Sequence, residues 1–256
     1  MSFIRLCTFG CVAVALGFIT STVSAAPSNI SVSGKQYGVT LGESRVIYPL
    51  DSAGVMVSVN NPQEYPVLIQ TRVLDEEKSA KAPFVVTPPL FRLDAKQRSS
   101  LRVTQTGGSF PHDKESLQWL CVKGIPPKDG DLWADGKKNE KNVDSSVGIS
   151  LQIAIDNCIK LMVRPSELKG NPSQFAGELS WKVEGQKLIA ENPTPFYMNL
   201  GKITFGGKDL PPHFVPPKAK WSFELPKGLS GQKDVSWQVI NDQGGLSQTY
   251  SNNVIY

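Results

Sequence analysis

Hydrophobic and polar residues alternate in short runs along most of the chain, and the runs end at proline, glycine or asparagine. A period of two places successive side chains on opposite faces of a strand, whereas the helical period near 3.6 is scarce here. The pattern is typical of antiparallel sandwiches built from many short strands. The clearest runs in the first part of the chain are residues 44–50, 54–59, 67–74, 99–104, 117–123 and 147–163.

The strand pattern is interrupted between residues 164 and 172, where proline and glycine break it. We therefore predict an all-β protein of two domains, at residues 26–166 and 167–256. Residues 126–146 are rich in Lys, Asp, Gly and Asn and predict a surface loop in the first domain. The strands expected in the second domain are residues 178–183, 187–191, 196–205, 220–225 and 235–240.

The first residues have the layout of a secretory signal peptide. Arg5 precedes an apolar run at residues 6–19, and a stretch of small residues ends at Ala25 and Ala26. The apolar run is shorter than the roughly 20 residues that a spanning helix needs, and no later segment approaches that length. We expect a signal peptide at residues 1–25, cleaved after residue 25 or 26, and an exported protein without membrane insertion.

The cysteines support export. Cys7 and Cys11 lie in the apolar run and leave with the signal peptide, so Cys121 and Cys158 are the only two in the mature chain. A single pair in an exported protein predicts one disulfide bond, because the bacterial periplasm is oxidising. Two free buried thiols are the alternative.

Charge and composition argue against nucleic-acid binding and catalysis. The net charge is +4, falls to +3 when Arg5 is removed, and is spread through the chain, unlike a clustered nucleic-acid footprint. His112 and His213 are the only histidines, and we expect both at the surface. They do not support a catalytic triad or a histidine zinc site, and no P-loop or nucleophile elbow is present. We therefore predict no catalytic residue, no metal and no cofactor.

The run at residues 147–155 has one face made only of large aliphatic side chains. These are Val147, Ile149, Leu151, Ile153 and Ile155. Most such patterns belong to ordinary core strands, but this face is long beside the usual strand of about 5 to 6 residues. An edge strand of this kind would aggregate unless it were covered. We therefore interpret it as a donor strand that inserts into an incomplete sheet of a partner.

Two cations accompany this strand. Lys160 follows it, and Arg45 lies in the early run at residues 44–50. A pair of cations at the base of a cleft between two domains could hold a carboxylate. Simple solvation of both side chains is the alternative, because spacing alone does not constrain their distance.

Residues 110–126, with the sequence FPHDKESLQWLCVKGIP, resemble the signature of periplasmic pilus-assembly chaperones. The resemblance extends over essentially the whole mature chain. Its further landmarks are YPVLIQ at 65–70, TPPLFRL at 87–93, NPTPFY at 192–197 and INDQGG at 240–245. A cysteine pair flanking a long loop resembles the subfamily with a long connection between strands F and G, which serves capsule-like antigens and afimbrial adhesins.

The resemblance implies two immunoglobulin-like domains in an L or boomerang arrangement. It implies donor-strand complementation of fimbrial or adhesin subunits, and delivery of these subunits to an outer-membrane usher. Arg45 and Lys160 match the cations that anchor the C-terminal carboxylate of the subunit. Ile30 and Val32 match a second edge contact. A charged set that holds the two domains together is matched by Arg92, Glu115 and Asp242.

A different function would be an immunoglobulin-like fibre subunit or adhesin. Such a subunit would carry an alternating N-terminal extension, but residues 26–33 are short and alternate only weakly. The sequence leaves open which subunit is the client. It also leaves open whether the free protein self-associates.

Overall fold

The computed structural model describes residues 31–128, 130–133, 148–229, 231 and 233–254. The expected signal peptide and most of the predicted loop at residues 126–146 lie outside these ranges. So do two of the predicted contact residues, Ile30 and Val147.

The first domain is a sandwich of two sheets. One sheet has five strands: β3 (Arg45–Pro49), β11 (Asp156–Arg164), β9 (Ser116–Ile125), β5 (Val67–Leu74) and β7 (Leu90–Leu93), in that order. The other has four strands: β2 (Thr40–Leu41), β4 (Val55–Asn60), β8 (Arg98–Gln105) and β6 (Phe84–Thr87). The inward-facing side chains of both sheets, among them Tyr48, Leu101 and Leu120, form one core. The alternation seen in the sequence therefore marks the faces of these strands.

The second domain repeats this layered plan. Its smaller sheet has three strands: β12 (Ser180–Glu184), β13 (Lys187–Asn192) and β17 (Ala219–Glu224). Its larger sheet contains β15 (Lys208–Asp209), β14 (Met198–Phe205), β18 (Asp234–Val239) and β19 (Tyr250–Asn253), with β16 (Phe214–Val215) paired to β14. A helical turn, α1 (Pro172–Phe175), leads into the domain and is followed by the 3-10 turn Ala176–Glu178. The core packs Phe196, Phe205 and Trp237 between the two sheets.

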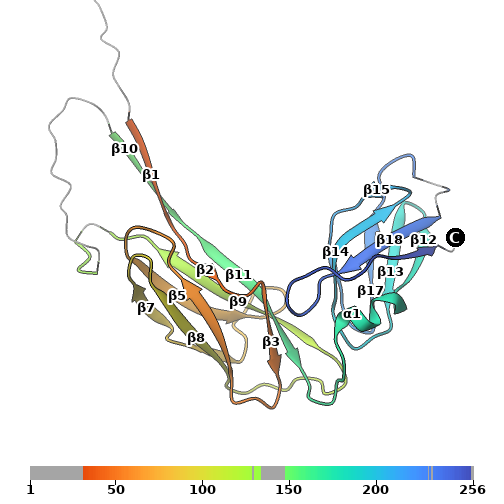
Figure 1. Cartoon of the computed structure of the whole chain (residues 1–256), viewed down its shortest axis with the longest axis horizontal. Helices are drawn as coiled ribbons and strands as arrows, with labels where there is room; N and C mark the ends of the chain where they lie inside the picture. Colours follow the sequence, from red (N-terminus) through yellow and green to blue (C-terminus); the bar gives the residue numbers. More distant parts are fainter. Residues whose placement is uncertain (1–30, 129, 134–147, 230, 232, 255–256) are drawn as a thin grey trace, which may run out of the picture.

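A third element projects from the first domain. Strands β1 (Ser31–Tyr37) and β10 (Gly148–Ala154) pair in parallel and form a two-stranded ribbon that extends away from the sandwich (Figure 1). The two domains lie at an angle to each other, which gives the molecule the predicted boomerang shape (Figure 1). The run at residues 147–163, predicted as one strand, is two strands, because Ile155 interrupts it between β10 and β11.

Candidate functional site

The large side chains on one face of β10 remain in solvent. Ile149 is 50% exposed, Leu151 53% and Ile153 41%, while Ile155 at the base of the ribbon is half-buried. A strand that faced its own core would bury these positions. An ordinary core strand is therefore excluded for Ile149, Leu151 and Ile153. Exposed aliphatic side chains at every second position are typical of a surface that another chain covers.

Strand β1 extends this apolar surface. Val32 lies opposite Ile149 in the parallel register, and it is 69% exposed. Directly paired residues of neighbouring strands project from the same face of a sheet. Val32, Ile149, Leu151 and Ile153 therefore form one surface, which we call the apolar ribbon face. Within the described ranges, no strand pairs with the second edge of β10, so its main-chain groups there are available to a partner.

Backbone hydrogen bonds at Ile155 fasten the ribbon to the sandwich. The Ile155 amide donates to the Tyr37 carbonyl at 2.9 Å, and the Ile155 carbonyl accepts from the Gly124 amide at 2.9 Å. A Cβ atom at residue 124 would lie 2.1 Å from the Tyr37 oxygen, so only glycine fits this close approach. The ribbon is therefore held at its base and exposed along its length.

The two predicted cations are neighbours. Lys160 on β11 pairs with Arg45 on β3 in a parallel register, so both side chains leave the sheet on the same face. The Lys160 ammonium donates to Oδ1 of Asn199 in the second domain and lies 4.6 Å from the Phe214 ring centroid. Arg45 makes a long hydrogen bond of 3.5 Å to the Ile240 carbonyl. The cation pair therefore lies where the two domains meet.

Neither cation has a carboxylate within salt-bridge distance among the described residues. The Nε atom of Arg45 is buried and has no hydrogen-bond partner there. Burial, together with the charges of Arg45 and Lys78, lowers the pKa of Lys160 from 10.5 to about 8. Burial also lowers the pKa of Arg45. An anion bound between the two would supply the missing charge, so the pair is suited to a carboxylate.

A largely buried ion-pair network joins the two domains. Arg164 donates from Nε to Glu115 at 2.7 Å and makes a bidentate contact of 2.8 Å with each carboxylate oxygen of Asp242. Glu115 also accepts from the Tyr197 amide at 2.8 Å. Burial raises the pKa of Glu115, although its cationic partner opposes the shift. The two carboxylates of the predicted charged set, Glu115 and Asp242, therefore lie in one network, and Arg164 of β11 joins them.

That arginine is not the predicted one. Arg92 lies on β7 and forms an ion pair with Asp94 at 3.0 Å. Its neighbour on β5 is Leu68, which pairs on its other side with Ile125, the last residue of β9. Glu115 precedes the first position of β9, at the other end of the sheet. The prediction for Arg92 is therefore wrong. Arg164 could have been recognised as a charged residue that ends an apolar strand at the domain boundary.

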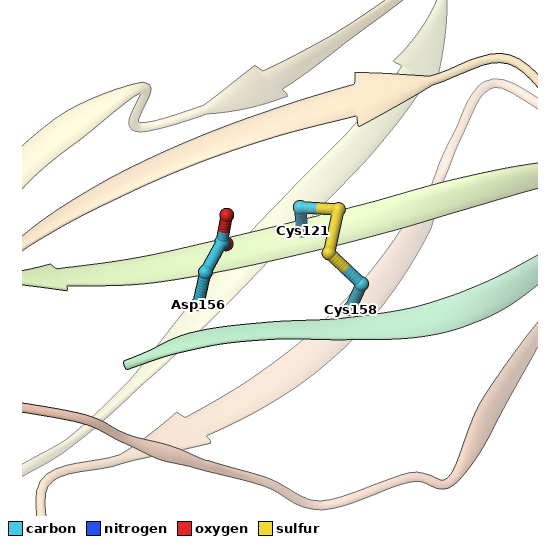
Figure 2. Close-up of side chains that lie close together, drawn as sticks. All are labelled: Cys121, Asp156 and Cys158. Atoms are coloured by element: carbon cyan, nitrogen blue, oxygen red, sulfur yellow. A yellow bond between two sulfur atoms is a disulfide. The ribbon is translucent and has the colours of Figure 1, made fainter. Parts of the chain in front are cut away.

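The predicted disulfide is present. Cys121 on β9 and Cys158 on β11 face each other in the antiparallel register and are bonded, with their Cα atoms 4.0 Å apart (Figure 2). Asp156 lies beside them and pairs with Arg72. Because both sulfur atoms are in the disulfide, they are not thiolates that could bind a metal. The bond crosslinks the sheet just below the ribbon.

His213 is not the plain surface residue expected from its proline-rich turn. Its ring stacks on Trp221 at a centroid distance of 3.7 Å and on Phe214 at 4.5 Å. Its Nδ1 atom is hydrogen-bonded to the Phe214 carbonyl at 2.7 Å. The sequence contains no local signal for this stack, because β16 and β17 bring the rings together.

Residues 38–169 match the family described as "Pili and flagellar-assembly chaperone, PapD N-terminal domain". Residues 174–251 match "Pili assembly chaperone PapD, C-terminal domain". The chain belongs to the PapD family of pilus-assembly chaperones. The family assignment favours a chaperone over the fibre subunit considered from the sequence.

The chaperone is similar to chaperone protein caf1M of Yersinia pestis, with 62% identity over 254 residues that cover 98% of each chain. Its structure is similar to the Escherichia coli chaperone DraB, with a TM-score of 0.76 and 42% identity over 88% of this chain and 100% of that chain. A chain from the Salmonella enterica complex of SafA pilin with the SafB chaperone gives a TM-score of 0.76 and 41% identity, at the same coverage.

The chaperone is periplasmic, as the predicted export implies. None of the helices in the described ranges is long and apolar enough to cross a membrane. The relatives are chaperones, a class of protein that binds other chains rather than converting a substrate.

Proposed function

We propose that this chaperone binds a fimbrial or adhesin subunit by donating β10 to the subunit's incomplete sheet, and that it works by binding alone, without catalysis. The observation that carries the proposal is that one continuous run, β10 followed by β11, holds both the exposed aliphatic strand and Lys160, with Arg45 directly beside Lys160 on β3. The relative SafB occurs in complex with a pilin, which supports a client of the same class.

The apolar ribbon face supplies the larger part of the affinity. Full burial of an aliphatic side chain contributes about 1.5 to 3 kcal/mol before ordering costs are subtracted. About half of each of Ile149, Leu151 and Ile153 is still exposed, so a subunit groove can cover this area. Main-chain hydrogen bonds to the unpaired edge of β10 would add the client strand to the ribbon.

The cation pair sets the register. A slip of one residue between paired strands turns every side chain to the opposite face. If Arg45 and Lys160 hold the client's terminal carboxylate, the last strand of the client is fixed at that end. Along the chaperone's own extended chain, Lys160 lies about 36 Å from Ile149, at about 3.3 Å per residue. The cation pair, which acts as a carboxylate clamp, and the apolar ribbon face therefore work together. The proposal also includes delivery of the client to an outer-membrane usher and self-association of the free chaperone.

Co-purification of a fimbrial or adhesin subunit co-expressed with the chaperone tests the mechanism. Ile153→Asp places a charge on the apolar ribbon face, and Lys160→Ala removes half of the clamp; we expect both variants to lose the subunit. The matched control is Gln152→Asp, which adds the same charge one position away on the opposite face of β10 and should retain it. Retention of the subunit by Ile153→Asp, or equal loss with Gln152→Asp, would contradict donation by this face.

A further inference from the structure

An apolar hollow lies directly beside Lys160. It has a volume of about 350 Å³, and its lining combines the apolar residues Trp119, Leu200, Pro212, Phe214 and Ile240 with the polar residues Lys160, Asn199 and His213. Lys160 is the charged member of this lining, and β9 and β11 of the first domain face β14 and β16 of the second across the space. We call it the terminal hollow. It is not needed for strand donation or for the carboxylate contact.

The walls of the hollow are fixed before any ligand arrives. The Trp119 indole donates from Nε1 to the Glu76 carbonyl at 2.9 Å, and the Lys78 ammonium lies 3.7 Å from the indole ring centroid. On the other side, Phe214 packs edge-on against Tyr197, with centroids 5.7 Å apart. Preset walls lower the ordering cost of binding, so such a hollow can discriminate between side chains.

The two neutral polar side chains of the lining, Asn199 and His213, already have hydrogen-bond partners within the protein. Asn199 accepts from Lys160 and donates to the Tyr197 carbonyl at 3.3 Å. The Nδ1 atom of His213 is bonded to the Phe214 carbonyl. A polar side chain placed here would lose its water without gaining these partners, and a cationic one would face Lys160. The lining therefore favours a large apolar side chain, and flat rings on two walls favour an aromatic one.

We propose that the terminal hollow holds the side chain of the client's last residue, and that the chaperone prefers clients ending in a large apolar, above all aromatic, residue. The inference rests on the proposed carboxylate clamp. The carboxylate and the side chain of a terminal residue branch from the same Cα atom, so a carboxylate on Lys160 brings that side chain to the hollow that Lys160 lines. The next residue faces the other way in an extended strand and does not reach it.

Probe peptides separate the hollow from the clamp. Each probe is a fluorescent strand of alternating valine and threonine that ends in Phe, Leu, Gly or Lys, made both as the free acid and as the amide. Fluorescence anisotropy on the full-length mature chaperone measures their dissociation constants. We expect the Phe acid to bind about tenfold more tightly than the Gly acid, with Leu between them and Lys weakest.

Two variants assign the preference to the lining. Phe214→Ala should reduce the ratio between the Gly and Phe dissociation constants to about threefold or less. Tyr250→Ala removes a ring of the second domain that does not line the hollow and that stacks on Trp237 instead of on a lining residue, so it should leave the ratio unchanged. The ranking of probes on the wild-type chaperone stands as a test even where Phe214→Ala fails to fold.

The outcomes are distinguishable. Equal binding of acids and amides would overturn the carboxylate clamp and with it this inference. If the chaperone binds the acids more tightly than the amides but binds the Phe and Gly acids equally, this inference is overturned while the carboxylate clamp stands. A Phe preference lost equally in Phe214→Ala and Tyr250→Ala would also overturn it, because the lining would not be its source.

Discussion

The lowered pKa of Lys160 predicts that client binding weakens in mildly alkaline solution. Its ammonium has a pKa of about 8 in the free protein because it is buried beside Arg45 without an anion. A bound carboxylate favours the charged form and raises this pKa, so binding takes up a proton above pH 8. Affinity should therefore fall as the pH rises through 8, while the client carboxylate, with an ordinary pKa near 3.5, stays ionised throughout.

The expected size follows from the protonated fraction of Lys160. With a pKa of about 8, roughly nine-tenths of the ammonium is charged at pH 7 and roughly one-tenth at pH 9. If only the charged form binds the carboxylate, the dissociation constant of the Phe acid probe rises about tenfold between these two pH values. Anisotropy titrations at constant ionic strength measure this directly, because salt also screens the contact.

Two controls separate Lys160 from other causes. Lys160→Arg keeps its charge at pH 9, since an arginine is effectively always protonated, and should give a nearly flat profile. The amide probe lacks the carboxylate and should also be nearly flat. A tenfold loss that persists in Lys160→Arg, or a flat profile for the wild-type chaperone, would refute the assignment of the pKa and of the clamp.

Three further variants test the energetics. Lys160→Met should abolish discrimination between acid and amide probes. It should also stabilise the free chaperone against urea, by at most roughly 3 kcal/mol, because the lowering of the pKa from 10.5 to about 8 marks an unfavourable buried charge. A variant less stable than the wild type would count against this reasoning. Glu115→Ala should cost about 3 to 5 kcal/mol by leaving a buried guanidinium partly unpaired, whereas Lys218→Ala breaks an exposed pair and should change the urea midpoint little. Replacing Cys121 and Cys158 by alanine should cost roughly 4 kcal/mol for a sequence separation of 37, measured against the oxidised wild type; an unchanged midpoint would refute the chain-entropy argument.

The strands could be predicted from the sequence because their pattern is local. The run at residues 67–74 coincides with β5, whose burial alternates along its length. The exposed aliphatic face of β10 was recognisable for the same reason, since five apolar positions exceed what one core strand needs. The break at Ile155 was not, because its hydrogen bonds go to Tyr37 and Gly124, which are distant in sequence.

The alternation of hydrophobic and polar residues could not predict the contacts between elements that are distant in sequence. Alternation says which face a residue occupies, but it does not say which strand lies beside it. The parallel pairing of β1 with β10, and the assembly of Trp119, Phe214 and Lys160 around one hollow, therefore appear only in the folded chain. The resemblance names Arg92 as the partner of Glu115 and Asp242, whereas Arg164 pairs with both. Sequence position alone does not separate two arginines on strands of the same sheet.

The crosslink between β9 and β11 has a mechanical consequence. A client drawn away along the axis of the ribbon pulls β10 lengthwise, and the hydrogen bonds at Ile155 carry that load in shear. Three residues further on, the load reaches Cys158, which is covalently joined to the neighbouring strand. The ribbon thus cannot be drawn out of the sheet beyond this point while the disulfide is intact. The crosslink therefore limits how far tension on the ribbon can pull its strand out of the sheet.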